Sequence, residues 1–298
     1  MEVPKRLGDL VNYKRKGESK MKKKLSFLGV IFSTGMLLAA CGGDDSTSSE
    51  EGSSTDGGSD LKLVEDGKFT TASSGLYKPF NFTEGGDLTG FDIDISNALS
   101  EEMGLEPNPV TTPWETILQG LTTNRFDAII GSMAITEERE KQVSFSDPYY
   151  YSGGVIFTRA GNTEIKSEAD LEGAKIGVVG QSTYDTAAQK YTDDIQYYNS
   201  DVVALQDLAI EGRLDAVITA DVVGFEAQNA GLEVEMVGDP LWIEQAAVAI
   251  NKEDEELLAA VNEALAAIVE NGTYEEISDK WFGRNLLDVD LEGVEILK

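Results

Sequence analysis

The stretch LTTNRFDAIIGSMA, residues 121–134, predicts the end of a helix, a short polar turn and a buried strand that begins with Asp-Ala. A second stretch, AIEGRLDAVITADV at residues 209–222, repeats this pattern further along the chain. Short apolar runs that alternate with amphipathic segments are typical of α/β layers. Two such halves predict an α/β protein with two lobes, each with its own sheet. Ligands of open α/β sheets bind beyond the carboxyl ends of the strands, so the residues after Ile130 and Ile218 are candidates for a site in a cleft between the lobes.

The spacing of the apolar residues places the other elements. Strands are predicted at 68–73, 127–131, 175–179 and 215–219, where short apolar runs rich in β-branched residues are bounded by polar ones. Helices are predicted at 91–104, 113–125, 182–191, 202–213, 254–271 and 273–281. The clearest helix is 254–271, in which Leu258, Val261, Leu265 and Ile268 form one apolar stripe.

The first sixty residues differ in composition from the rest. A basic segment, 21–24, precedes the apolar run 25–40, and the small residues Ala39 and Ala40 come directly before Cys41. This order defines a secretory signal at 21–40. The apolar run is shorter than the ~20 residues that a spanning helix needs. Residues 1–20 lie upstream of the basic segment, so we expect them to be a non-native extension and Met21 to be the true start.

Cys41 is the only cysteine of the 298 residues, and the chain has no histidine. It therefore cannot form an intramolecular disulfide, and no histidine can activate the thiol or share a metal with it. The sequence Leu38-Ala39-Ala40-Cys41 resembles a bacterial lipobox, in which the cysteine sulfur receives a diacylglycerol before cleavage. Each buried acyl CH₂ contributes about 0.8 kcal/mol, so several chains would hold the protein at the cell membrane. The alternative is an uncleaved membrane anchor.

The charge of the chain is strongly negative. It holds 24 Lys and Arg against 54 Asp and Glu, and nine of the basic residues lie in residues 1–24. Residues 42–60 are nearly all Gly, Ser, Thr, Asp and Glu, which predicts a flexible acidic tether. A chain this acidic is repelled by nucleic acid and by anionic lipid, so we expect no nucleic-acid partner.

Arg139 is the first candidate binding residue. In AITEER, Thr136 has the chemistry of a helix N-cap, which places Arg139 in the first turn of the helix. A cation there opposes the helix dipole, so the position costs local stability and points to a function. A guanidinium binds a carboxylate through two parallel hydrogen bonds. The alternative is a surface arginine paired with Glu138 or Asp147.

Six segments between residue 61 and about residue 285 carry a family resemblance. They are SSGLYKPFNF, GFDIDISNAL, FDAIIGSMAITEEREKQVSFSDPYYYSGG, KIGVVGQSTYDT, EGRLDAVITADV and NGTYEEISDKWFG. In order and spacing they resemble the polar amino acid solute-binding proteins of ABC importers, the type-II periplasmic-binding-protein family. The resemblance implies a two-lobed α/β fold with two crossover hinge strands, near Phe157 and Val248. Lobe 1 would be 61–157 plus 249–288, lobe 2 would be 158–248, and 289–298 would be a C-terminal tail.

The resemblance also implies roles for individual residues. Arg139 would hold the ligand's α-carboxylate, assisted by Thr183, while Tyr77 and Trp114 would pack on its two sides. As an alternative, both aromatic residues could belong to the core. The other residues expected in the site are Ser74, Gly131, Ser132, Met133, Ser182 and Asp221.

Two positions depart from the family pattern. Ala134 stands where many relatives have a hydroxyl residue, and Ala220 stands where relatives have an aspartate that pairs with the ligand's ammonium group. Three explanations are open: Asp221 reaches the ammonium, backbone carbonyls hold it, or the ligand is not an ordinary α-amino acid. Asp221 could instead cap the following helix. Ser74 replaces a side-chain-selecting acid of some relatives, so we expect little selection for a cationic side chain.

The resulting prediction is a monomeric solute-binding lipoprotein on the extracytoplasmic face of a Gram-positive membrane. It would deliver a polar amino acid, or a related small zwitterion, to an ABC permease without a cofactor, metal or catalytic residue. One alternative is a cleft enzyme such as a prephenate- or arogenate-type dehydratase, in which Glu137 or Asp221 would be the acid. A sensor ectodomain is the other alternative.

Overall fold

The computed structural model describes residues 61–289, 291 and 295–297. The predictions for residues 1–60, which concern the extension, the signal, the lipidation of Cys41 and the tether, lie outside this part of the chain.

An eight-stranded mixed sheet organises the described residues, with the strand order β5-β1-β6-β11-β7-β10-β8-β9. Its strands are β1 (Lys68–Ser73), β5 (Glu106–Thr111), β6 (Ala128–Ile129), β7 (Val143–Arg159), β8 (Ile176–Val179), β9 (Ile195–Tyr198), β10 (Ala216–Ala220) and β11 (Val234–Asn251). A small antiparallel sheet contains β2 (Leu76–Tyr77), β3 (Asn81–Glu84) and β4 (Asp87–Thr89).

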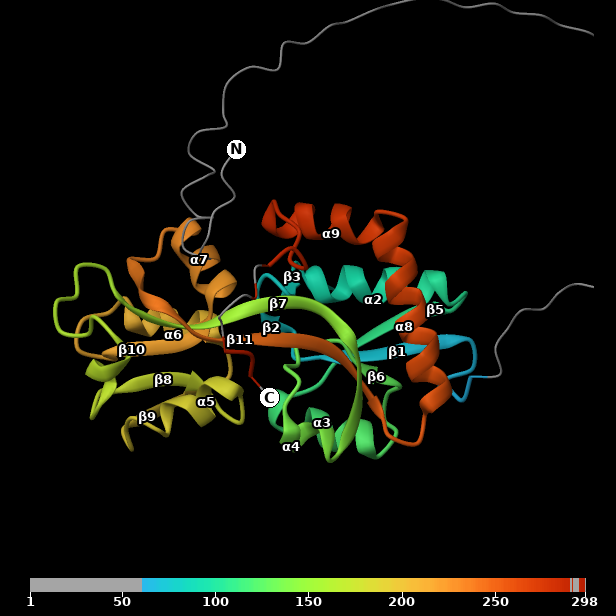
Figure 1. The fold of residues 1–298 in the computed structure, drawn as a ribbon, viewed down its shortest axis with the longest axis horizontal. Helices are drawn as coiled ribbons and strands as arrows, with labels where there is room; N and C mark the ends of the chain where they lie inside the picture. The colour runs from blue at the N-terminus through green and yellow to red at the C-terminus, as the bar shows by residue number, and fades with distance from the viewer. Residues whose placement is uncertain (1–60, 290, 292–294, 298) are drawn as a thin grey trace, which may run out of the picture. The chain divides into compact units, whose positions relative to one another are not determined.

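The two long strands β7 and β11 join the two halves of the large sheet (Figure 1). They pair with each other antiparallel from Val143↔Asn251 to Arg159↔Val234. On one side β11 pairs with β6, and on the other β7 pairs with β10. The expectation of a separate sheet in each lobe is therefore wrong, because β7 and β11 belong to both lobes. We call the β5-β1-β6 side with its helices the first half, and the β10-β8-β9 side with its helices the second half.

Helices cover the sheet (Figure 1). They are α2 (Phe91–Glu102), α3 (Trp114–Thr122), α4 (Glu137–Glu140), α5 (Thr183–Ala188), α6 (Asp201–Leu208), α7 (Asp221–Asn229), α8 (Glu255–Glu270) and α9 (Thr273–Phe282). The six predicted helices and four predicted strands are confirmed, most of them with shorter bounds. In α8 the buried face contains Val261, Leu265 and Ile268, as predicted, but Leu257 is buried where Leu258 was expected. A stripe of period 3.6 reaches Val261 from Leu257 four residues earlier, which leaves Leu258 at its edge.

The repeated Asp-Ala has the same structural role in both halves. The Asp127 carboxylate accepts the backbone N–H of Thr70 at 2.7 Å, next to the parallel pairing of β6 with β1. The Asp215 carboxylate accepts the backbone N–H of Lys175 at 2.8 Å, next to the parallel pairing of β10 with β8. Each aspartate thus ties the start of its strand to the start of the neighbouring one, which fixes their carboxyl ends side by side.

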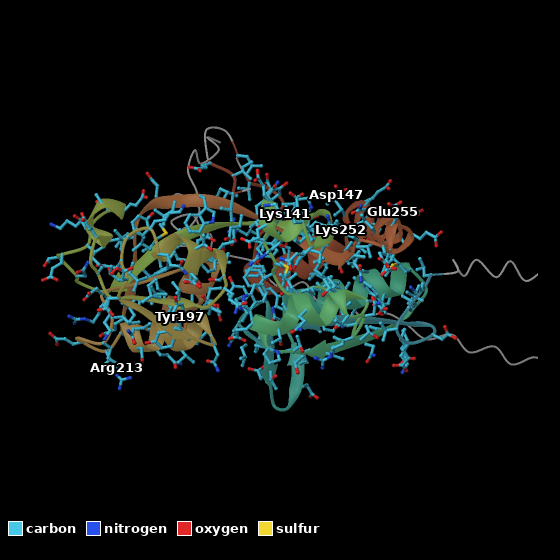
Figure 2. The ribbon with its side chains drawn as sticks, turned by 90° about the horizontal axis from the view of Figure 1, so that it is seen from below. Lys141, Asp147, Tyr197, Arg213, Lys252 and Glu255 are labelled. Carbon is cyan, nitrogen blue, oxygen red and sulfur yellow. The ribbon has the colours of Figure 1, made fainter. Side chains whose placement is uncertain are left out.

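In the part of the chain that the structure describes, no helix has both the length and the apolar character needed to cross a bilayer. Charged side chains extend from the surface, such as Lys141, Asp147, Lys252 and Glu255 on one region and Arg213 at the opposite end of the view (Figure 2).

Candidate functional site

A cavity lies at the carboxyl ends of β1, β6 and β8, where the two halves meet beside β11. About 530 Å³ of space lies between its lining atoms, part of it open to solvent. The first half contributes side chains from the segments after β1 and β6 and from the starts of α3 and α4, and the second half from the starts of α5 and α6. The lining residues are Ser74, Leu76, Tyr77, Trp114, Gly131, Ser132, Ala134, Arg139, Val179, Ser182, Thr183, Tyr184, Asn199, Asp201 and Glu244.

Eight of the ten residues predicted for the site line this cavity. They are Ser74, Tyr77, Trp114, Gly131, Ser132, Arg139, Ser182 and Thr183. Most of them follow strands or begin helices, where α/β folds present their binding groups. The family resemblance indicated which of these positions to name. That these residues bind a ligand stays a prediction.

Met133 and Asp221 are not among the lining residues, contrary to the prediction. Met133 is fully buried and packs in an apolar cluster with Ile117 and Leu121. Asp221 is buried at the first position of α7, where its Oδ1 accepts the backbone N–H groups of Val222 at 2.8 Å and Gly153 at 3.2 Å. These bonds direct the Asp221 carboxylate to the backbone of β7 and of the helix start.

Arg139 enters the cavity as a buried cation. As predicted, Thr136 caps α4: its side chain accepts the backbone N–H of Arg139 at 3.2 Å. The Arg139 side chain is only 8% exposed, and its Nη1 donates to the carbonyl of Ala134 at 2.8 Å. Its Nη2 donates across the cavity to the carbonyl of Gln181 at 3.5 Å.

No carboxylate of the described residues lies within salt-bridge distance of Arg139, so the expected alternative, a surface pair with Glu138 or Asp147, is not formed. Burial lowers the pKa of the guanidinium, and the negative charge of Glu244 opposes this shift. Because an arginine stays charged in proteins, its burial without an ionic partner is costly unless an anion binds to it.

A buried aspartate holds the loop after β6. The Asp92 carboxylate accepts hydrogen bonds from Asn81 Nδ2 at 2.7 Å, Tyr149 OH at 2.8 Å and Ser132 Oγ at 2.9 Å. Burial raises the pKa of Asp92 to about 6 against the effect of these three donors. Ser132 has a φ of 59°, a left-handed conformation that is uncommon for residues other than glycine. The network therefore fixes a strained loop at the cavity wall.

The second half and β11 supply two acids that the sequence analysis did not identify. Glu244 of β11 accepts hydrogen bonds from Thr183 Oγ1, from Tyr184 OH at 2.8 Å and from Trp242 Nε1 at 3.1 Å. Asp201, the first residue of α6, accepts one from Thr219 Oγ1 at 2.7 Å. An acid within the apolar run LWIEQAAVAI was a detectable signal for Glu244. Asp201 gave none, because acids in the first turn of a helix are ordinary.

Hydrogen bonds connect the two halves around the cavity. Besides the bond from Arg139, Ser200 Oγ donates to the carbonyl of Leu76 at 2.9 Å, and the hydroxyls of Tyr77 and Tyr184 lie 3.5 Å apart. The Tyr77 ring stacks on Phe80 at a centroid distance of 5.2 Å. Tyr77 therefore has both a packing contact and a place in the cavity, so the core and ligand interpretations of this residue are compatible.

This fold and this cavity define a class of protein. Two α/β halves joined by two long strands enclose a cavity with aromatic walls, a buried cation and buried acids, which is the architecture of a two-lobed solute-binding protein. The sequence profile of the bacterial extracellular solute-binding proteins, family 3, matches residues 69–284. The chain belongs to this family.

Known relatives agree with this assignment. The chain is 32% identical over 230 residues to the L-cystine-binding protein TcyJ of Escherichia coli K12. The aligned region covers 76% of this chain and 86% of that protein. It is 37% identical over 219 residues to the L-arginine-binding protein of Pseudomonas aeruginosa. This aligned region covers 69% of this chain and 84% of that protein. A solved ancestral arginine-binding protein bound to arginine is 36% identical with a TM-score of 0.68, and the match covers 73% of this chain and 99% of that one.

Proposed function

We propose that this protein captures a polar amino acid, or a small zwitterion related to one, in the cavity and delivers it to the permease of an ABC importer. The observation that carries the proposal is Arg139: a buried cation that lines the cavity and has no carboxylate partner among the described residues. The names of the relatives, which bind cystine and arginine, support an amino acid as the ligand.

The ligand's α-carboxylate would bind to the Arg139 guanidinium. Arginine carries five N–H donors, and the bonds to Ala134 and Gln181 use two of the nitrogens once each. The remaining donors can bind a carboxylate in a charge-assisted pair, which is stronger than bonds between neutral groups. In this proposal Ser182 and Thr183 lie on the opposite wall, at the start of α5.

The aromatic residues would enclose the rest of the ligand. Tyr77 and Trp114 line the cavity from the first half, and Tyr184 lines it from the second. Aromatic side chains bury a large area with few rotatable bonds, which suits a cavity that must exclude water. Serine at position 74, with its Oγ donating to Asn81 Oδ1 at 3.0 Å, places no charge on this wall.

Capture would occur by closure of two lobes and without chemistry. We take residues 61–157 plus 249–288 as lobe 1 and 158–248 as lobe 2. Gly154 to Phe157 pair with β10 of the second half. The boundary in β7 therefore moves from the expected position near Phe157 to before Gly154, and residues 154–157 go with lobe 2. A ligand that touches Arg139 and the second half together stabilises the closed form, since only contacts that differ between two states shift their populations.

The protein would act as a monomer on the outer face of the cell membrane, held by lipid on Cys41 at the end of the tether 42–60. The composition of residues 21–60 supports this part of the proposal.

A binding experiment tests the function. Residues 61–298 would be screened by thermal shift against the standard amino acids and L-cystine, because a ligand that binds only the folded state raises the melting temperature. We expect stabilisation by an amino acid, confirmed by calorimetry, and recovery of that compound unchanged after incubation. Conversion of the compound would identify an enzyme instead, and the absence of any stabilisation would contradict the proposal.

A further inference from the structure

The second acid of the cavity, Asp201, is buried but has few partners. Its side chain is 5% exposed and lines the cavity. Its carboxylate accepts the hydroxyl of Thr219 at Oδ1, the one donor from another described residue, and its own backbone N–H. A carboxylate can accept about four hydrogen bonds, so Asp201 can accept further donors. Buried charges are costly unless they are paired, which makes Asp201 a candidate for a cationic group of a ligand.

A buried aspartate of the first half, Asp92, shows what a purely structural aspartate looks like. Asp92 lies in the first turn of α2, as Asp201 lies in the first turn of α6, and each accepts a hydroxyl from a residue at the end of a central strand or just after it. Asp92, however, accepts three side-chain donors and is not among the lining residues of the cavity. Asp201, by contrast, lines the cavity and accepts one side-chain donor.

Glu244, the other acid of the cavity, is already occupied. Its two carboxylate oxygens accept bonds from Thr183, Tyr184 and Trp242, residues of α5 and β11. These bonds position the second wall of the cavity and leave Glu244 less able to accept a ligand group than Asp201.

We infer that Asp201 binds the ammonium group of the ligand, while Arg139 binds its carboxylate. This inference rests on the proposed function and specifies it. Ala220, the residue that stands in place of an acid at the end of β10, follows Thr219 directly. β10 thus supplies no acid of its own at this point, but its Thr219 donates a hydrogen bond to the carboxylate of Asp201 on α6. Asp201 takes the role that the sequence analysis gave to Asp221.

The electrostatic surroundings of Asp201 are consistent with this role. Burial raises the pKa of Asp201 to about 6, the Thr219 hydroxyl and the residue's own backbone N–H lower it, and the charge of Glu244 raises it. The other titratable groups of the cavity are Tyr77 from β2, Tyr184 from α5 and Arg139 from α4. An ammonium at Asp201 would return the pKa toward ordinary values, so binding would favour the ionised carboxyl and weaken as the pH falls below about 6.

The test compares an amino acid with its analogue that carries hydrogen in place of the α-amino group. L-arginine and L-cystine, with their desamino analogues, would be titrated calorimetrically into the wild type and into Asp201→Asn at neutral pH. Asparagine keeps the acceptor for Thr219 but removes the charge. One of these amino acids should bind to the wild type. We expect Asp201→Asn to bind that amino acid roughly thirtyfold or more weakly than the wild type does, as for the loss of one partner of a buried charge pair. Its affinity for the desamino analogue should change little.

Two further variants make the result specific. Glu244→Gln should weaken the binding of the amino acid and of its analogue alike, because it disturbs the cavity wall and not the contact with the ammonium group. Thr219→Val, which frees Asp201 from its donor, should lose affinity for the amino acid selectively and by less than Asp201→Asn. A circular dichroism spectrum and a melting curve of each variant establish that it is folded.

Equal losses for the two compounds in Asp201→Asn, unchanged affinities, or an ammonium-selective loss in Glu244→Gln would each overturn the role of Asp201. If the wild type binds amino acids in an Arg139-dependent way, these outcomes leave the proposed function standing. A wild type that binds no amino acid would overturn both.

Discussion

The guanidinium carbon of Arg139 lies 5.5 Å from the centroid of the Trp114 ring, so the buried cation of the cavity rests on an aromatic face. Such a contact stabilises a desolvated cation by about 2 kcal/mol or more, which offsets part of the cost of its burial. It also fixes the direction of the guanidinium before a ligand arrives. One wall of the cavity is therefore organised around a single charge.

Arg139→Ala should abolish most of the binding while the chain stays folded. The variant leaves the ligand's carboxylate buried without a partner, which should cost about 3 kcal/mol or more of binding free energy. Arg139→Lys is the matched control: it keeps the charge but loses the planar fork, so its affinity should lie between those of the wild type and the alanine variant. Calorimetry with the amino acid found in the screen measures all three, and an unchanged affinity in Arg139→Ala would refute the role.

Asp201→Asn should raise the stability of the ligand-free protein at neutral pH. The folded-state pKa of Asp201 is about 6 against an ordinary 3.8, so the folded state binds the proton more tightly than the unfolded state. The stability from this group is therefore present at low pH and is lost as the pH rises through about 6, at a cost of about 3 kcal/mol.

Urea denaturation at about pH 4 and about pH 8 checks this sign. The wild type and the variant should differ more at the higher pH, with the variant the more stable. Asp92, whose pKa is also about 6, contributes equally to both proteins and cancels in the comparison. A larger difference at the lower pH would contradict the expected linkage.

Gly154→Ala should destabilise the wall that carries Glu244. A Cβ at this position would lie 2.5 Å from the Trp242 ring, so the ring or the strand must move. Overpacking of this kind costs typically about 1–3 kcal/mol. Gly180→Ala is the control, since its Cβ would meet only the Tyr197 ring at an ordinary 3.5 Å. Urea denaturation should show a loss for the first variant alone, and equal stabilities would argue against the packing described.

Cys41→Ser should release the protein from cells that otherwise retain it. Serine cannot form the thioether to diacylglycerol, so the variant should lack the lipid that holds the protein at the membrane. Fractionation into membrane and medium, with the intact mass of the wild type, measures this. A wild-type mass without lipid, or any peptide from residues 1–20, would contradict the prediction for the N-terminal segment.

Local patterns were enough to predict much of the fold and the cavity. The two Asp-Ala strands and the Thr136 cap follow from short-range rules, and the structure places them as expected. The family resemblance supplied the rest of the correctly placed lining residues.

The remaining differences from the expected lining arise from tertiary packing. Met133 directly follows a lining residue, Ser132, but its side chain packs into the apolar cluster with Ile117 and Leu121. Asp221 adjoins Ala220, yet the backbone of β7 and of α7 binds its carboxylate. Asp201 and Glu244 come from a helix start and a strand whose approach to the cavity depends on the long pairing of β7 with β11, which no local pattern specifies.

The shared sheet has a mechanical consequence. Because β7 and β11 run as one paired ribbon through both halves, opening requires elastic twisting of that ribbon rather than the swing of a slack linker. The ladder is irregular between Ala246 and Ala249, in the stretch between the pairing with β10 and the pairing with β6, where the twist can concentrate. Such a joint restricts the motion to few directions, so Arg139 and Asp201 would return to the same separation after each cycle of loading and release.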